Sequence, residues 1–355
     1  MSEVNRIYIA NVAMVTPVGN NALMSAASIN ASVSAIAETG VLNKKLKPIK
    51  MGLVREDALV QLNPKLLQLN LPSRQMRLLR LAASALKQLS QSLPNHRIPL
   101  YLALPENLPE KTQSIKGNFI EQLAIQSSIA FNIEQSLIAE VGRPGALYAM
   151  KHAQRFFAES GEDYLLVGGV DTYWDMKLLA KLDSEDRLMV DGSVDGFFPG
   201  EGASFTLLVS DRVKHSLPSP HVSFASPGLA TEAGHFYSDE PYRGDGLSAA
   251  VSKSFDTAAS GTVDSIWTSM IYDSFCSKEF GVALTRNNSK FSKNVKMRHP
   301  VDCLGDMGAA MGSALLGLIF SNASKKSQGT HHLVCCSSDL SHRAALRVDI
   351  DRQEI

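Results

Sequence analysis

The spacing of apolar and polar positions predicts helices in six parts of the chain. In residues 73–93 apolar side chains recur every three to four positions, which is the helical period. They are Met76, Leu79, Ala83, Leu86 and Leu89. Ser73 is the expected N-cap of this helix, and Asn20 or Asn21 the expected cap of the first one. The other predicted helices cover residues 22–31, 109–130, 144–159, 246–258 and 306–320.

Short apolar runs rich in β-branched residues predict strands. They cover residues 6–15, 51–55, 98–104, 136–140, 163–169, 203–210, 221–225, 265–271, 331–337 and 344–350. We expect 136–140 to be a buried strand and 171–201 to be a loop region. Because strand, helix and strand follow one another across residues 136–169, the sheet should be parallel there and covered on both faces.

The second part of the chain repeats the order of the first. Helix 144–159 is followed by strands 163–169 and 203–210, and helix 306–320 by strands 331–337 and 344–350. A polar, proline-bearing segment, 211–220, separates the two series. This order predicts an α/β fold with two equivalent halves, residues 1–210 and 221–355, made by duplication of one unit. Chance recurrence of generic βαβ spacing is the alternative.

Composition narrows the range of functions. Lys plus Arg number 35, as do Asp plus Glu, so a nucleic acid or an anionic membrane is not an expected partner. No apolar run reaches the roughly 18 residues of a membrane span, and residues 1–6 lack the pattern of a signal peptide. Four cysteines without a CxxC pair predict neither a disulfide framework nor a zinc site. We therefore expect a cytoplasmic protein without a metal or other cofactor.

The start of helix 144–159 has the geometry of an active site. Pro144 suits the first turn of a helix, whose unpaired N–H groups favour an anionic nucleophile or a ligand oxygen. The chain instead places Arg143 there, within the segment VGRPGALYAM.

Four motifs make the chain resemble a β-ketoacyl synthase (3-oxoacyl-acyl carrier protein synthase) of the thiolase-like superfamily. They are MVTPVGN at 14–20, VGGVD at 167–171, DGFFPGEGA at 195–203 and GDMGAAMG at 305–312. The resemblance covers nearly the whole chain, and the third motif is its most specific part. It implies a five-layered αβαβα fold of two pseudo-equivalent halves, and a dimer.

The residues that carry the family's chemistry are replaced. The resemblance puts Arg143 at the nucleophilic cysteine, Met270 near the first catalytic histidine and Asp306 at the second. The family's lysine falls near Val301, and its C-terminal glycine-rich turn is replaced by SSDLS at 337–341. A protonated guanidinium cannot carry an acyl group, and an ionised aspartate cannot donate a hydrogen bond. The sequence therefore predicts a degenerate member without an intact catalytic set.

Arg143 and Asp306 begin two equivalent helices in this interpretation. Since the resemblance brings these positions to one site, they are expected to form an ion pair that fills the former catalytic centre. The alternative is that Arg143 points to solvent.

Cys303 is the candidate for another nucleophile, with His299 as its base in the spacing His299-x3-Cys303-x2-Asp306. The alternative is that Cys303 is a small buried hydrophobe, which is also our interpretation of Cys335 and Cys336. The Gly200-Glu201-Gly202 segment is expected to be structural, with glycines in tight turns and Glu201 bonded to loop backbone. Residues 307–320 predict a closely packed buried helix rather than a cofactor site.

Two classes of function follow. In the first, the protein is a binding or assembly partner without condensing activity. It would be a chain-length-factor-like subunit that forms a homodimer or a heterodimer with a ketosynthase, or an accessory protein of type VI secretion effectors. An acyl carrier protein and a secreted effector are further candidate partners. In the second, it is an acyltransferase or decarboxylase that acts on acyl-acyl carrier protein or acyl-coenzyme A through a non-standard site.

Overall fold

A large mixed sheet of 11 strands forms the centre of this computed structural model, which describes residues 6–109, 115–256, 261–325 and 330–352. Its order is β11-β10-β12-β13-β8-β1-β7-β6-β4-β5, and β9 pairs with β13. The strands are β1 (Ile7–Val15), β4 (Leu100–Ala103), β5 (Leu137–Ala139), β6 (Tyr164–Thr172), β7 (Glu201–Val209), β8 (His221–Phe224), β9 (Gly228–Thr231), β10 (Val263–Thr268), β11 (Phe291–Arg298), β12 (His331–Ser337) and β13 (His342–Asp351). A separate hairpin pairs β2 (Ile36–Leu42) with β3 (Pro48–Gly52).

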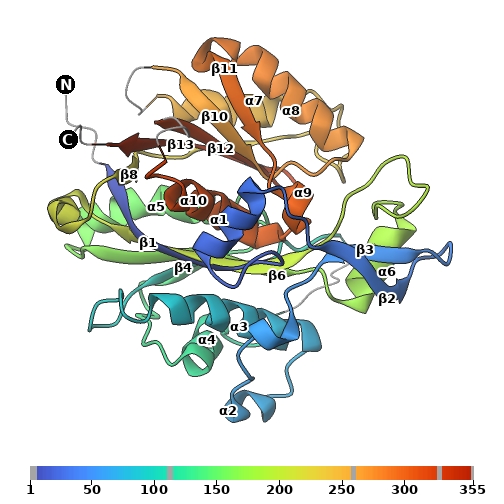
Figure 1. Cartoon of the computed structure of the whole chain (residues 1–355), viewed down its shortest axis with the longest axis horizontal. Helices are drawn as coiled ribbons and strands as arrows, with labels where there is room; N and C mark the ends of the chain where they lie inside the picture. Colours follow the sequence, from blue (N-terminus) through green and yellow to red (C-terminus); the bar gives the residue numbers. More distant parts are fainter. Residues whose placement is uncertain (1–5, 110–114, 257–260, 326–329, 353–355) are drawn as a thin grey trace.

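The helices form three layers around the two parts of this sheet. They are α1 (Ala22–Asn30), α2 (Pro64–Leu67), α3 (Ser73–Leu86), α4 (Phe119–Ser127), α5 (Gly145–Glu159), α6 (Met176–Ser184), α7 (Asp245–Ser254), α8 (Ser274–Arg286), α9 (Val301–Leu304) and α10 (Met311–Ser321). Figure 1 shows α3 and α4 on one outer side, α7 and α8 on the other, and α5 and α10 between the sheet layers. This αβαβα arrangement confirms the expected fold. No helix within the described residues is long and apolar enough to cross a membrane.

The two parts of the sheet repeat one pattern of pairing. In β5-β4-β6-β7-β1 the strands β4, β5 and β6 are mutually parallel neighbours, whereas β7 is antiparallel to both β6 and β1. The order β11-β10-β12-β13-β8 has the same directions. The division of the chain into residues 1–210 and 221–355 stays a prediction.

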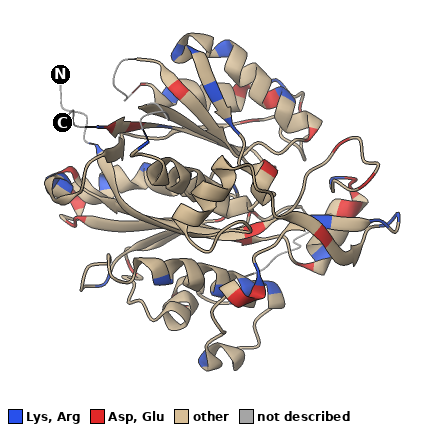
Figure 2. Cartoon of the chain, in the orientation of Figure 1, with Lys and Arg blue, Asp and Glu red and all other residues tan. Residues whose placement is uncertain are grey.

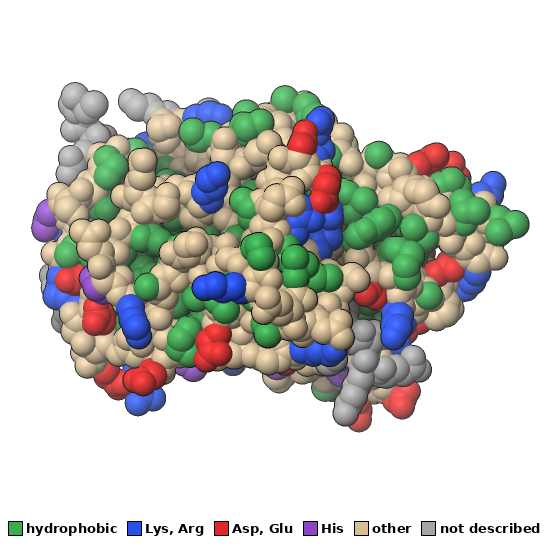
Figure 3. Space-filling view, turned by 90° about the horizontal axis from the view of Figure 1, so that it is seen from below, with side chains coloured by type: hydrophobic (Ala, Val, Ile, Leu, Met, Phe, Trp, Pro, Cys, Tyr) green, Lys and Arg blue, Asp and Glu red, His purple; other side chains and the backbone are tan. Residues whose placement is uncertain are grey.

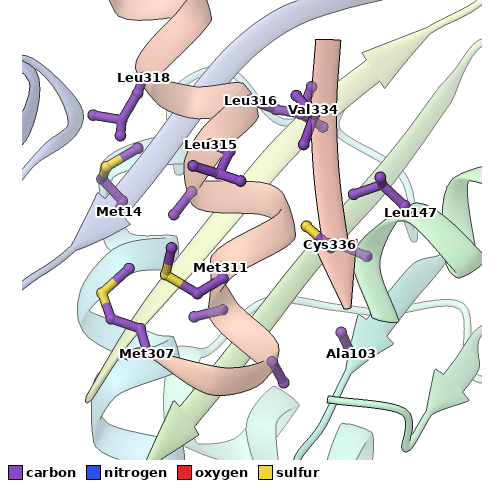
Figure 4. Close-up of a cluster of buried hydrophobic side chains, with 14 of the residues drawn as sticks. Met14, Ala103, Leu147, Met307, Met311, Leu315, Leu316, Leu318, Val334 and Cys336 are labelled. Carbon is purple, nitrogen blue, oxygen red and sulfur yellow. The ribbon is translucent and has the colours of Figure 1, made fainter. Parts of the chain in front are cut away.

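The middle layer is the most thoroughly buried part of the molecule. Met311, Leu315 and Leu316 of α10 are fully buried and lie near Leu147 of α5 and Val334 of β12 (Figure 4). Burial of each such side chain contributes about 1.5–3 kcal/mol. The prediction of a closely packed helix in residues 307–320 is therefore confirmed for α10. Charged side chains are sparse in this layer (Figure 2).

Several local predictions were wrong. Ser73 is the first residue of α3 and does not cap it, because Pro72 occupies the N-cap position. The segment 171–201 is not a continuous loop, since it contains α6, which Asp175 caps through the N–H groups of Lys177 and Leu178. Strand β5 is half-exposed rather than buried, because it lies at the edge of the sheet.

Several helices begin or end at other residues than the sequence predicted. The helix expected at 109–130 is the shorter α4, Phe119–Ser127, and residues 110–114 of that prediction lie outside the described residues. Residues 257–258 of the helix expected at 246–258 also lie outside them. Helix 306–320 begins only at Met311, after a 3₁₀ turn at Gly308–Ala310. Gly305 (φ +68°) and Gly308 (φ +48°) have left-handed backbone conformations that a helix cannot include. Asn21, and not Asn20, caps α1.

Candidate functional site

Arg143 points into the protein from the turn between β5 and α5. Gly142, before it, has φ +66°, and a Cβ atom at Gly142 would lie 3.1 Å from the carboxyl carbon of Glu106. Glycine is therefore strongly favoured at this turn, and the next side chain points inward. Arg143 is 2% exposed, so the alternative of a solvent-facing arginine is wrong.

The expected ion pair between Arg143 and Asp306 is present. Arg143 Nη2 lies 2.6 Å from Asp306 Oδ2, and Nε lies 3.0 Å from both carboxylate oxygens. The Tyr173 hydroxyl donates to Asp306 Oδ2 at 2.7 Å, and the Gly308 N–H donates to Oδ1 at 2.9 Å. Asp306 does not begin α10 as expected but lies two residues before the 3₁₀ turn Gly308–Ala310 that precedes it. Both of its oxygens are thus occupied.

A second carboxylate completes the charge balance around Arg143. Arg143 Nη1 lies 2.8 Å from Asp339 Oδ1, and Arg187 Nη1 lies 2.7 Å from Asp339 Oδ2. Two guanidinium groups and two carboxylates therefore alternate in a buried chain from Arg187 to Asp306. Sequence reasoning missed Arg187 and Asp339. The only signal was a charged residue in SSDLS, where the resemblance implies a glycine-rich turn.

The charges in this network stabilise one another against the cost of burial. Burial opposes the charge of Arg143, but Asp306 and Asp339 outweigh it and raise the pKa of Arg143 well above its ordinary value. Burial alone would raise the pKa of Asp339, yet Arg143 and Arg187 hold that pKa far below its ordinary value. Burial and the charge of Asp306 raise the pKa of Tyr173 well above 10, so its hydroxyl keeps its proton. Arg143 and Asp339 therefore stay charged near neutral pH.

Glu106, which lies beside this network, has a pKa near neutrality. It accepts hydrogen bonds from the N–H groups of Asp339 at 2.9 Å and Leu340 at 3.4 Å. Burial and repulsion from the Asp339 carboxylate raise the pKa of Glu106 to about 7, although Arg143 opposes this change. Glu106 thereby ties the loop after β4 to the segment after β12.

Almost no space remains beside Arg143. Within the described residues, Arg143 lines two cavities, with volumes of about 20 Å³ and about 10 Å³. The larger also contacts Tyr173 and Leu178, and the smaller contacts Met270, the position near the family's first histidine. A cavity needs about 10–15 Å³ to hold one water molecule. These spaces therefore fit single waters and not an acyl chain.

The Cys303–His299 pair does not form a hydrogen-bonded dyad. Cys303 is buried in α9, and burial raises the pKa of its thiol. Burial lowers the pKa of His299, whose Nδ1 is buried without a hydrogen-bond partner. Asp306, the third residue of this spacing, forms an ion pair with Arg143 instead. The nucleophilic role of Cys303 stays a prediction that this geometry does not favour.

Cys276 is a thiol near Arg143 that sequence reasoning did not single out. It lines the 10 Å³ cavity, and burial raises the pKa of Cys276 well above its ordinary value. A thiol held protonated is a weak nucleophile.

The remaining structural interpretations are largely confirmed. Cys335 and Cys336 are buried in the clusters on opposite sides of β12, as expected. Glu201 accepts the N–H of Val54 at 2.8 Å, as expected for a carboxylate bonded to loop backbone, and it also pairs with Arg77 at 2.6 Å. The glycines of this segment serve close packing rather than tight turns. A Cβ atom at Gly202 would lie 2.6 Å from the sulfur of Met307.

No protein-family model matches the chain, and no curated protein matches its sequence. Solved structures do match its fold. One is in the ketosynthase ApeO in complex with its chain length factor ApeC from Xenorhabdus doucetiae, with a TM-score of 0.76, 17% identity and 99% of both chains covered. Another is the ketosynthase from module 6 of the bacillaene synthase from Bacillus subtilis 168, with a TM-score of 0.75 and 15% identity, over 98% of this chain and 72% of that one. The ishigamide ketosynthase/chain length factor matches with a TM-score of 0.75 and 12% identity, over 97% and 99% of the chains. Taken with the αβαβα layers, these matches show that the chain has the thiolase-like fold of the ketosynthases.

Proposed function

We propose that this chain is a ketosynthase-like subunit without condensing activity, which acts as the binding or assembly partner of a catalytic ketosynthase. The observation that carries the proposal is the buried ion-pair network of Arg143, Asp306, Asp339 and Arg187. The resemblance puts Arg143 and Asp306 at catalytic positions of the family. An ion pair this well compensated has a structural role and leaves no group free for acyl transfer.

Condensation needs a nucleophile to hold the acyl chain and donors to stabilise the developing negative charge. Arg143 stays protonated, and both oxygens of Asp306 already accept hydrogen bonds from Arg143, Tyr173 and the Gly308 N–H. The two cavities at Arg143, about 20 and 10 Å³, leave no room for a substrate. The same geometry counts against the second class of function, an acyltransferase or decarboxylase that uses this site.

Two observations support a partner of the ketosynthase type. Structures of ketosynthases with chain length factors match this chain over nearly the full length of both chains. In addition, β5 pairs only with β4, so its outer edge is unpaired within the described chain, and Ile138 on it is 39% exposed. An unpaired, apolar edge strand is a surface on which a second chain can add its own strand.

The proposed assembly is a dimer through β5, homotypic or with a ketosynthase, in the cytoplasm. All four cysteines are free thiols, as a reducing compartment requires. An accessory role beside a type VI secretion effector, or with an acyl carrier protein, would use the same scaffold with another partner.

Photo-crosslinking in the native host tests the proposal. A photoreactive amino acid replaces Ile138, and the crosslinked protein is identified by mass spectrometry. The control carries it at Lys293 on β11, the opposite edge of the sheet, which is exposed. A ketosynthase crosslinked at 138 but not at 293 supports the proposal, and a second copy of this chain crosslinked at 138 supports the homotypic dimer. A secreted effector or spike protein in its place, or no position-specific product, contradicts it.

A further inference from the structure

Glu106 joins segments that lie far apart in the chain. It belongs to the loop after β4, and its carboxylate accepts the N–H groups of Asp339 at 2.9 Å and Leu340 at 3.4 Å, in the segment between β12 and β13. The same carboxylate packs against Gly142, where a Cβ atom would lie 3.1 Å from it. We call these interactions the Glu106 contact. They cover the turn that places Arg143 in the centre of the protein.

The Glu106 carboxylate is buried without a cation as its partner. Its hydrogen bonds within the described chain come from backbone N–H groups. Two guanidinium groups, those of Arg74 and Arg143, line the 20 Å³ cavity together with Glu106. Arg143 pairs with two other carboxylates, and Arg74 pairs with Asp171 at 2.9 Å. The positive charges at this cavity are therefore already balanced, and Glu106 is a carboxylate in excess.

The surroundings of Glu106 make its ionisation costly. Asp339 repels a second negative charge, and Arg143 attracts that charge more weakly. Asp171 of β6 and Tyr173, whose hydroxyl keeps its proton, also line the cavity. Asp and Glu side chains at the surface are solvated by water instead (Figure 3). Because burial and Asp339 together raise the pKa of Glu106 to about 7, this group gains and loses its proton near neutrality.

Loss of the proton favours separation of the two segments. A charged carboxylate in the Glu106 contact is shielded from water, whereas the same carboxylate is solvated once the loop after β4 moves away. Pro105, Glu106 and Leu108, which all belong to that loop, line the 20 Å³ cavity beside Arg143. Movement of the loop would therefore open this cavity and bring water to Arg143.

We propose that the Glu106 contact is a pH-sensitive switch, which closes the centre around Arg143 while Glu106 is protonated and opens it when Glu106 ionises. The switch does not depend on the proposed partner function, since it uses neither the edge of β5 nor a second chain. It is a local change, confined to the loop after β4 and the segment between β12 and β13.

Hydrogen–deuterium exchange of the full chain at pH 5 and pH 8, followed by mass spectrometry of its peptides, tests the switch. Rates are corrected for the intrinsic pH dependence of amide exchange. The closed form keeps a proton on Glu106 up to about pH 7, whereas an open, solvated Glu106 loses it near pH 4.5. The equilibrium constant for opening should therefore rise about 50–100-fold from pH 5 to pH 8 in peptides that contain residues 104–109 or 337–341.

Two comparisons separate the switch from other causes of exchange. The times are chosen so that β1, in the core, has not yet exchanged, and exchange in the two segments then reports local opening. The N–H of Val54 is the matched control, because it also donates to a buried carboxylate, Glu201, but one that pairs with Arg77. Its corrected exchange should be the same at both pH values.

Glu106→Gln keeps the size of the side chain but cannot ionise, so it should remove the pH dependence of exchange in both segments. Three results would each overturn the proposal: exchange in these segments that does not change with pH, an equal change in Glu106→Gln, or exchange that occurs only together with that of β1. The first and third results come from the wild-type protein, so they decide the proposal even where the variant does not fold.

Discussion

Replacement of Arg143 by methionine should destabilise the protein strongly. Methionine has similar length but no charge, so the change leaves two buried carboxylates facing it. Asp339 would keep Arg187, and Asp306 would keep the Tyr173 hydroxyl and the Gly308 N–H. Removal of one partner from a buried ion pair typically costs about 3–5 kcal/mol, and we expect Arg143→Met to lower the free energy of unfolding by that amount.

The network also predicts that changes in its members are not additive. Asp306→Asn removes the charge that faces Arg143 with little change of shape. The double variant, Arg143→Met with Asp306→Asn, removes both charges of the pair, so neither is left without its partner. The free-energy cost of the double variant should therefore fall below the sum of the two single costs by about 1–3 kcal/mol. Arg155→Met is the matched control, because Arg155 forms an exposed ion pair with Glu159 and should cost about 0.5 kcal/mol or less.

Urea unfolding followed by circular dichroism at neutral pH measures these free energies. If Arg143→Met costs no more than Arg155→Met, or if the two changes in the network are additive, then the ion pairs of Arg143 do not stabilise the fold.

Three further changes test other parts of the structure. Burial raises the pKa of Glu106 from an ordinary 4.5 to about 7. Between these pH values the folded protein holds a proton on Glu106 that the unfolded chain has lost. As the pH rises from 4.5 to 7, the free energy of unfolding therefore falls by about 3 kcal/mol because of this group. In urea unfolding at pH 5 and pH 8, Glu106→Gln should remove that loss, and an unchanged pH dependence would refute the assignment. Cys303 should react with iodoacetamide far more slowly in the native protein than in urea, because burial disfavours its thiolate. Rapid labelling of Cys303 alone in the native protein would instead support a nucleophilic role for it. Glu201→Gln should destabilise the fold by about 3–5 kcal/mol, since it leaves Arg77 without its buried partner, and a thermal melt close to that of the wild type would contradict this role.

The sequence predicted those features that depend on local pattern or on the resemblance. The helix predicted at 144–159 from the fit of Pro144 to a first turn is α5, which begins one residue later at Gly145. The pairing of Arg143 with Asp306 followed from placing both at one site. Strands 331–337 and 344–350 were also predictable, because the short apolar runs LVCC and AAL lie within β12 and β13.

What the sequence did not predict depends on contacts between distant segments. Arg187 and Asp339 lie 152 positions apart, and neither belongs to a periodic pattern. Glu106 looks like an ordinary polar loop residue, yet the fold buries it against the N–H groups of residues 339 and 340. Strand β5 looked buried because its residues are apolar, and only the strand order reveals it as an edge.

Intact-protein mass spectrometry tests the central claim most directly. The purified chain is incubated with acyl- and malonyl-acyl carrier protein, and both partners are then weighed. A centre closed by Arg143 and Asp306 predicts that the chain gains no acyl group and that the malonyl group stays on its carrier. A covalent acyl adduct on the chain, or decarboxylation of the malonyl carrier, would contradict the claim.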